Sequence, residues 1–118
     1  MPAISWLPGR LESAVSRAYY AAYQAMGAAL GDPPSSEQWR HLGIIRHFVS
    51  GYWYEPAHPP TRPGLLEHLR FRLHRLYQFR LDVDYDLIAL DSTSAEEGVA
   101  TAARTITEIE QRVRGESA

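Results

Sequence analysis

One arginine, Arg80, interrupts an apolar helical stripe and is the first residue in this sequence that calls for a chemical reason. It continues the spacing of four, three and four residues set by Leu69, Leu73 and Leu76. A buried guanidinium without a partner costs several kcal/mol, so we expect a carboxylate beside it, and Asp84 lies one helical turn further along. Arg80 and Asp84 therefore either form a helix-terminal salt bridge, or Arg80 is a ligand for phosphate.

A second candidate is the segment SRAYYAAY, which runs from Ser16 to Tyr23. Its alanines allow a neighbouring helix to approach closely, while tyrosine suits positions where the ring is buried and the hydroxyl is hydrogen-bonded. Arg17 and Tyr20 are three residues apart and share one helix face. These two side chains either pack at the surface or join a shared polar network or a dimer seam.

The residue types for metal chemistry are present, but their spacing is wrong. The five histidines include no pair three or four residues apart. Asp82, Asp84 and Asp86 resemble the start of a calcium loop, yet Leu87 and Thr93 stand where that loop needs glycine and glutamate. There is no cysteine, and we find no glycine-rich phosphate loop. The sequence predicts neither a metal site nor a bound cofactor.

Helical periodicity predicts the elements that must position these residues. An apolar stripe predicts a first helix over residues 11–30, ended by Gly31 and two prolines. Ser35 or Ser36 is expected to cap a second helix that runs to Gly51. Its expected buried positions are Trp39, Leu42, Ile44 or Ile45, Phe48 and Val49.

A proline-rich segment, EPAHPPTRPG, is expected to be a stiff loop before a third helix with its leucines on one side. Ser94 and Glu97 form a predicted capping box for a fourth helix. The expected buried stripe of this helix is Val99, Ala102, Ile106, Ile109 and Val113, with Gly115 after it. Between the last two helices, Val83, Tyr85 and Leu87 alternate with acids, which predicts an extended loop or a fraying helix.

These elements predict an all-α fold, an antiparallel bundle of four or five helices built as two hairpins. With 118 residues, the chain fits one domain over residues 1–118. The apolar and charged fractions of 45% and 22% are typical of a globular protein. We expect no secretory signal, no membrane span and a cytoplasmic location, since the start lacks an apolar core and cysteine is absent.

The charge distribution favours local rather than general binding of nucleic acid. The net charge is −2, but all twelve basic residues are arginines, and five of them lie between Arg62 and Arg80. Arginine recognises phosphate through planar, paired hydrogen bonds, although exclusive use of arginine is also expected from codon bias. Four aspartates then follow from Asp82 to Asp91, an acidic segment that suits a basic partner.

Three segments together resemble the HEPN domain, a small helical module. They are AVSRAYYAAYQAMGAAL, RHLGIIRHF and LYQFRLDVDYD, and the resemblance covers about residues 11–113. The motif at Arg17 to Ala21 is moderately specific, and His41, Arg80, Asp84 and Tyr85 follow in the expected order. The resemblance implies a HEPN-like bundle, usually a homodimer, often paired with a nucleotidyltransferase in a toxin–antitoxin or defence system.

The same resemblance implies site residues and three alternative functions. Arg80 matches the arginine of the ribonuclease members, but Asp84 stands near where their catalytic histidine lies, and an ionised aspartate cannot replace a histidine near neutral pKa. The favoured hypothesis is a module that binds a nucleotide, RNA or a nucleotidyltransferase partner, with Arg17, Tyr20, His41 and Tyr85 supporting Arg80. The alternatives are a metal-independent ribonuclease that borrows His41 or His47, and a purely structural interaction module.

Overall fold

A computed structural model describes residues 10–33, 39–57, 63–85 and 91–113. These residues form four α-helices and one 3-10 turn, with no β-strand among them. The elements are α1 (Arg10–Leu30), α2 (His41–Ser50), η1 (Glu67–Leu69), α3 (Arg70–Tyr85) and α4 (Ser92–Val113). The predicted all-α class is confirmed, whereas the HEPN-like antiparallel arrangement of two hairpins stays a prediction.

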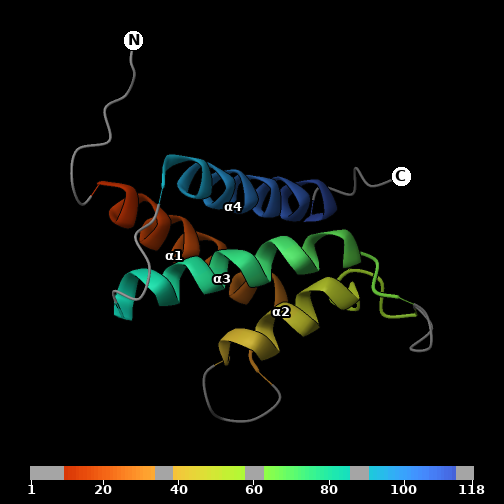
Figure 1. Ribbon diagram of the computed structural model, residues 1–118. Coiled ribbons are helices and arrows are strands. Elements are labelled where there is room, and N and C mark those ends of the chain that lie inside the picture. The colour runs from red at the N-terminus through yellow and green to blue at the C-terminus, as the bar shows by residue number, and fades with distance from the viewer. Residues whose placement is uncertain (1–9, 34–38, 58–62, 86–90, 114–118) are drawn as a thin grey trace.

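The helices lie in a central pair with one further helix on each side (Figure 1). α1 and α3 pack against each other in the middle, and both contact α4 above them and α2 below them in this view. α1 therefore contacts every other α-helix, so its side chains can join residues that are distant in the sequence. None of the helices within the described ranges combines the length and apolar character needed to cross a membrane.

The apolar core divides into two clusters. The first joins α1, α3 and α4 and contains Val15, Ala18, Tyr19, Ala22, Leu76, Phe79, Ala95 and Ala102. The second joins the end of α1, α2 and the start of α3 and contains Met26, Ile44, Ile45, Phe48, Val49, Leu66, Leu69 and Leu73. Tyr23 packs against both clusters, so the tyrosine-rich segment of α1 lies where they meet.

The first and third helices follow their predicted stripes. α1 ends at Leu30, and Gly31 then adopts a left-handed conformation with φ of 81°, which glycine tolerates best. In α3 the leucines of the stripe are buried as expected, with η1 forming the first turn. The helix continues through Tyr85, so the helical alternative for residues 83–87 holds up to that residue, and the remainder of the segment lies outside the described residues.

The second helix is shorter than predicted. It begins at His41, whereas Ser35 and Ser36, the expected caps, lie outside the described residues. Leu42 is 53% exposed, which corrects its assignment to the buried face, while four other apolar residues of the helix are buried as expected. Leu42 shares a helix face with Ile45 and Val49 but lies in the first turn of α2, which begins only at His41.

The connection after α2 holds the backbone of residues 63–66 close to the end of that helix. The amide of Leu66 donates to the Val49 carbonyl at 2.9 Å, and the amide of Leu65 donates to Ser50 at 3.2 Å. A Cβ atom at Gly64 would lie 2.2 Å from the Val49 carbonyl oxygen. Only glycine allows this approach, which places Leu66 in the second core cluster.

The fourth helix buries only part of its predicted stripe: Ala102 is buried and Ile109 packs against the second core cluster. Val99 and Val113 are 43% and 72% exposed, whereas Gly98, Thr101, Thr105 and Glu108 are buried. Gly98 lies against Leu76 of α3, where an added Cβ would come within 3.1 Å of a methyl group. The two threonine hydroxyls donate to carbonyls one turn earlier, so they can be buried without unpaired donors.

The cap of α4 also differs from the predicted one. The side chain of Asp91 accepts a hydrogen bond from the amide of Ser94 at 2.8 Å, so Asp91 rather than Ser94 is the capping residue. Glu97 forms a bidentate ion pair with Arg75 of α3 instead of closing a capping box. Gly115 lies outside the described residues. The ion pair ties α3 to α4 near the surface.

Candidate functional site

The side chain of Arg80 leaves α3 and lies against the tyrosines of α1. Its Nη2 atom donates a hydrogen bond to the hydroxyl of Tyr20 at 2.7 Å. The Cζ atom lies 5.3 Å from the ring centroid of Tyr19 and 5.2 Å from that of Tyr20, within the range of a cation–π interaction. Arg80 is half-buried. Its positive charge therefore lies at the protein surface next to two tyrosine rings and is only partly exposed to water.

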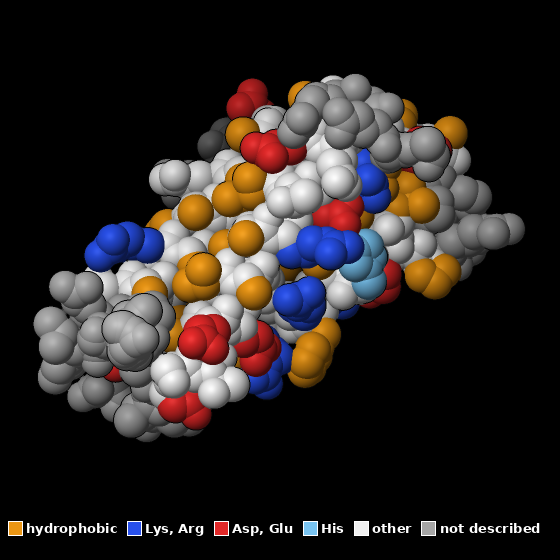
Figure 2. All heavy atoms as spheres, turned by 90° about the horizontal axis from the view of Figure 1, so that it is seen from above, with side chains coloured by type: hydrophobic (Ala, Val, Ile, Leu, Met, Phe, Trp, Pro, Cys, Tyr) orange, Lys and Arg blue, Asp and Glu red, His pale blue; other side chains and the backbone are white. Residues whose placement is uncertain are grey.

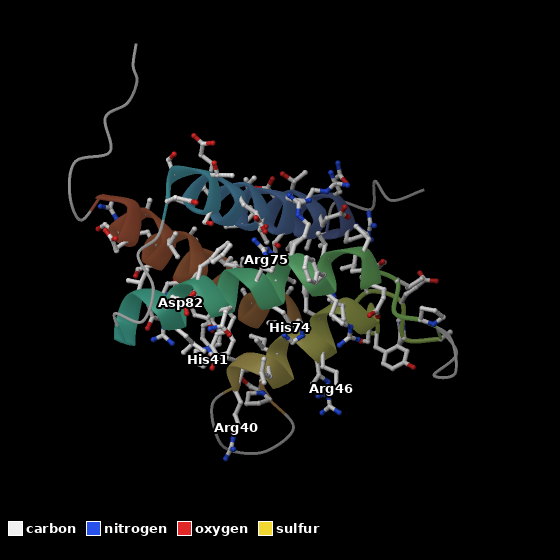
Figure 3. All side chains as sticks on the ribbon, in the orientation of Figure 1. Arg40, His41, Arg46, His74, Arg75 and Asp82 are labelled. Carbon is white, nitrogen blue, oxygen red and sulfur yellow. The ribbon has the colours of Figure 1, made fainter. Side chains whose placement is uncertain are left out.

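His41 joins the same site from the first residue of α2. Its Nδ1 atom is hydrogen-bonded to the hydroxyl of Tyr19, which is almost fully buried in α1. The imidazole stacks on Tyr77 of α3 with 5.1 Å between ring centroids, and Figure 3 shows it lying between α2 and α3. Three helices therefore hold this histidine. We call the group the Arg80–His41 cluster, defined as Tyr19, Tyr20, Tyr23, His41, Tyr77 and Arg80.

The electrostatics of the cluster keep both His41 and Tyr19 uncharged at neutral pH. Burial lowers the pKa of His41 below its ordinary value, and the nearby Arg80 charge lowers it further. Burial raises the pKa of Tyr19 well above its ordinary value, although Arg80 opposes this rise. The guanidinium is then the charged member of a group of neutral hydrogen-bonding rings, which is suited to an anion such as phosphate.

Tyr23 connects the cluster to the segment before α2. Its hydroxyl donates to the backbone carbonyl of Trp39 at 2.5 Å, and its ring stacks near that of Tyr19. This contact fixes the chain that leads into α2, so His41 reaches α1 in a defined position. Leucine at position 23 would supply the packing but not the hydrogen bond, which explains one of the tyrosines in SRAYYAAY.

The structure brings together some of the predicted site residues and separates others. Tyr20, His41 and Arg80 meet in the cluster, as just described. Arg17 is exposed, and its Nη2 atom lies 3.4 Å from Ser13 Oγ on the same helix, so its described contact is local. Asp84 and Tyr85 belong to the last turn of α3, but their side chains lie outside the described part of the molecule. The Arg80–Asp84 ion pair therefore stays a prediction.

Asp82, the first residue of the predicted acidic segment, has a structural position. It is 7% exposed, and its carboxylate accepts a hydrogen bond from the side-chain amide of Gln78 at 3.1 Å. Over the described ranges, no group of three or more histidine, aspartate or glutamate side chains is placed to hold a metal ion. Asp82 lies in α3 and contributes to packing rather than to an exposed acidic loop.

A second charged group, which the sequence reasoning missed, lies on α4. Glu108 is 5% exposed and contacts three basic side chains: Arg104 at 3.1 Å, Arg112 at 3.0 Å and His68 at 3.6 Å. Figure 2, which views the molecule from the α4 side, shows basic, acidic and histidine side chains adjacent on this face. The signal was present, because both arginines are four residues from Glu108. Glu108 lies beside the predicted apolar stripe, directly before Ile109, and is not a member of it.

Comparison with known proteins does not assign a function to this chain, so a function has to be inferred from its own residues. No protein-family model matches the sequence, and no curated protein or solved structure gives a significant match. What the Arg80–His41 cluster can do is bind a phosphate through the guanidinium, offer tyrosine rings and hydroxyls beside it, and present a neutral imidazole.

Proposed function

We propose that the chain is a HEPN-like helical module that binds the phosphate of RNA or of a nucleotide at the Arg80–His41 cluster. The observation that carries the proposal is the position of the Arg80 guanidinium, which is half-buried and bonded to the Tyr20 hydroxyl at 2.7 Å. A cation held in this way keeps its charge at the surface while its direction is fixed. Such pre-organisation favours binding of an anion, since less side-chain freedom is lost on association.

The surroundings of Arg80 support a nucleotide rather than a simple anion. Tyr20 is 43% exposed, so part of its ring is open to solvent next to the guanidinium. Exposed aromatic rings beside a positive charge are the combination with which proteins bind single-stranded nucleic acid, by stacking on the base and pairing with the phosphate. We further propose that the module acts as a homodimer or with a nucleotidyltransferase, as the HEPN resemblance implies.

The binding proposal is tested by titrating a fluorescently labelled single-stranded RNA, and separately AMP, with wild-type protein and with Arg80→Ala. Loss of the guanidinium is expected to weaken binding at least about 10-fold, the effect of one charge-assisted hydrogen-bonding group. Arg17→Ala is the matched control, because it removes the same charge from an exposed position of α1 that contacts Ser13. This variant is expected to bind within about 2-fold of wild type.

The two variants also define the result that rejects the site. Equal weakening by Arg80→Ala and Arg17→Ala would mean that binding follows total charge rather than the cluster. No binding of RNA or AMP by the wild-type protein would leave the interaction module, with a protein partner, as the better hypothesis. Far-UV circular dichroism of each variant shows whether the helices are retained.

A metal-independent ribonuclease is the second candidate, and the position of His41 favours it. A neutral imidazole can accept the proton of a ribose 2′-hydroxyl as that oxygen attacks the adjacent phosphorus, while the bond to the 5′-oxygen breaks and that oxygen takes a proton from water. This role requires the tautomer in which Nδ1 donates to the Tyr19 oxygen, so that the lone pair of Nε2 serves as the base. Arg80 would stabilise the negative charge that develops on the phosphate.

Cleavage assays separate this candidate from simple binding. RNA incubated with the protein in the presence of EDTA should be cut by wild type and not by His41→Ala, while His41→Ala still binds RNA. Intact RNA with wild-type protein, in an assay where binding is complete, would reject the ribonuclease and keep the binding module.

A further inference from the structure

A pocket of about 250 Å³ opens on the side of the molecule where α1 and α2 end. Leu30, the last residue of α1, lies on its wall together with Asp32, which follows the helix. Ser50, the last residue of α2, also lines the pocket, together with His47. Two helix C-termini therefore meet at one cavity, and each carries a partial negative charge.

Three aromatic side chains complete the wall, and they are Trp39, Tyr52 and Trp53. Both indole N–H groups are used by the backbone: Trp39 donates to the Gly31 carbonyl at 2.8 Å and Trp53 donates to the Phe48 carbonyl at 2.9 Å. Neither indole N–H is therefore left to donate to a ligand, so both indoles contribute to the wall through their rings; one face of the Trp53 ring is stacked on Phe48, with 5.4 Å between the ring centroids. The negative face of an indole ring attracts a cation more strongly than the other aromatic side chains do.

The charged groups of the pocket wall also favour a cationic ligand. Asp32 supplies a carboxylate, and no lysine or arginine belongs to the described wall. His47 lies 5.1 Å from the Trp39 ring, and burial and the nearby Arg46 lower its pKa, so the imidazole is neutral at pH 7. Arg40 and Arg46 are exposed, and in Figure 3 both extend outward from α2. The lining presents a carboxylate, aromatic rings and helix C-termini.

We infer that this pocket binds a small organic cation, a methylated ammonium group held between the indoles of Trp39 and Trp53 and the carboxylate of Asp32. Its volume is below the range of about 300–1,000 Å³ that is usual for drug-sized ligands, so it fits a head group rather than a whole nucleotide. A nucleotide would also bring a phosphate beside Asp32. The inference concerns a different ligand class from the Arg80–His41 cluster and is independent of the proposed function.

Indole N–H signals in ¹H–¹⁵N correlation spectra provide the test. Choline chloride is titrated into the protein, with sodium chloride at the same ionic strength as the salt control. The neutral isostere 3,3-dimethylbutan-1-ol has the shape of choline without its charge. Choline is expected to shift the Trp39 and Trp53 signals and to bind at least about 5-fold more tightly than the isostere, the size expected of a partly exposed cation–π site.

Asp32→Asn tests the carboxylate and is expected to weaken choline binding about 5-fold. The matched control is Glu55→Gln, which removes an exposed carboxylate from the nearby connection without changing the described wall. Equal affinity for choline and its neutral isostere would overturn the inference, because the pocket would then select shape alone. Shifts of the two indoles with AMP but not with choline would overturn it as well.

The source of the ammonium group is resolved by a further titration with N-acetyl-trimethyllysine amide. Tighter binding of this compound than of choline supports a methylated lysine of a partner protein as the ligand. Tighter binding of choline supports a free small molecule. Both results support a cation-binding site. The comparison of choline with its neutral isostere uses the wild-type protein, so it tests the site even when Asp32→Asn does not fold.

Discussion

Arg80 Nη2 and Tyr20 Oη lie 2.7 Å apart although their residues are 60 positions apart in the chain. This contact joins α3 to α1 at the surface of the Arg80–His41 cluster, and it depends on a stable central pair of helices. The hydroxyl fixes the direction of the guanidinium, and a side chain that is already positioned loses less conformational freedom when it binds an anion.

Tyr20→Phe should show how much ligand affinity depends on the orientation of the Arg80 side chain, because this variant leaves the charge of Arg80 in place. The phenylalanine ring keeps the aromatic contact, but the hydroxyl that accepts from Nη2 is lost. The free energy of unfolding is expected to fall by about 1 kcal/mol or less, because the bond is exposed. RNA or AMP affinity is expected to fall about 3-fold, less than in Arg80→Ala. Urea denaturation and the anisotropy titration measure the two effects, and an unchanged affinity would contradict a role for the hydroxyl.

Acid should destabilise the fold through two histidines. The folded protein holds the pKa of His41 and of His47 below the ordinary value, because burial disfavours the charged ring. The unfolded chain therefore binds these protons more tightly, so stability is fully present above about pH 6.5 and is lost as the pH falls below it. Urea denaturation at about pH 7.5 and about pH 5.5 should show the decrease.

The double variant His41→Gln, His47→Gln removes both groups and should flatten this pH dependence. The carboxylates of Glu67 and Glu97 do not contribute to the difference in stability between about pH 7.5 and about pH 5.5. Their pKa values are lowered in the folded protein, so the stability they add is lost only when the pH falls below their ordinary value of 4.5. A pH slope in the double variant equal to that of wild type would show that other groups are responsible.

Glu108→Ala should be among the more destabilising single changes on α4. It leaves Arg112, whose side chain is only 17% exposed, without the carboxylate that contacts it at 3.0 Å. We expect a loss of about 2–3 kcal/mol in the free energy of unfolding, because an uncompensated charge would stay largely buried. Arg104→Ala removes a partner that is 53% exposed and should cost about 1 kcal/mol or less. Chemical denaturation compares them, and equal losses would argue against burial as the cause.

Gly64→Ala tests the close approach of the α2–α3 connection to the end of α2. The new methyl group would lie 2.2 Å from the Val49 carbonyl oxygen, so the backbone must move, and we expect a loss of about 3 kcal/mol or more. Gly27→Ala is the control, because its Cβ would meet Ile44 at an ordinary 3.9 Å inside α1. That variant should be more stable than wild type by about 1 kcal/mol, through helix propensity. Thermal unfolding distinguishes the two signs.

Burial could be predicted for residues that follow a strong helical periodicity. It could not be predicted for residues whose burial depends on which helix packs against them. The stripes of α1 and α3 gave their helices and most of their buried residues, because leucine, valine and alanine at helical spacing have one stable arrangement. The buried face of α4 was predicted only in part: Ala102 is buried as expected, but Gly98, Thr101 and Thr105 are buried because of their small size and internal hydrogen bonds rather than their hydrophobicity. Periodicity does not reveal such choices.

The candidate site was predictable only in part for a related reason. Arg80 could be singled out because it breaks an apolar stripe, and Tyr20 because it lies in an unusual segment. The meeting of His41 with Tyr19 and Tyr77 depends on where α2 begins and how it packs. Whether Arg17 faces solvent or the neighbouring helices depends in turn on the rotation of α1 about its axis. Neither quantity can be read from spacing along the chain.

The division of the core into two clusters has a dynamic consequence for the site. α2 contributes its buried face entirely to the second cluster, while Arg80 extends from a part of α3 that packs in the first. A local opening that detaches α2 would carry His41 away from Arg80 and leave the other three helices associated. Ligand occupancy that engages both side chains would oppose that opening and slow amide hydrogen exchange in α2, far more than in α4.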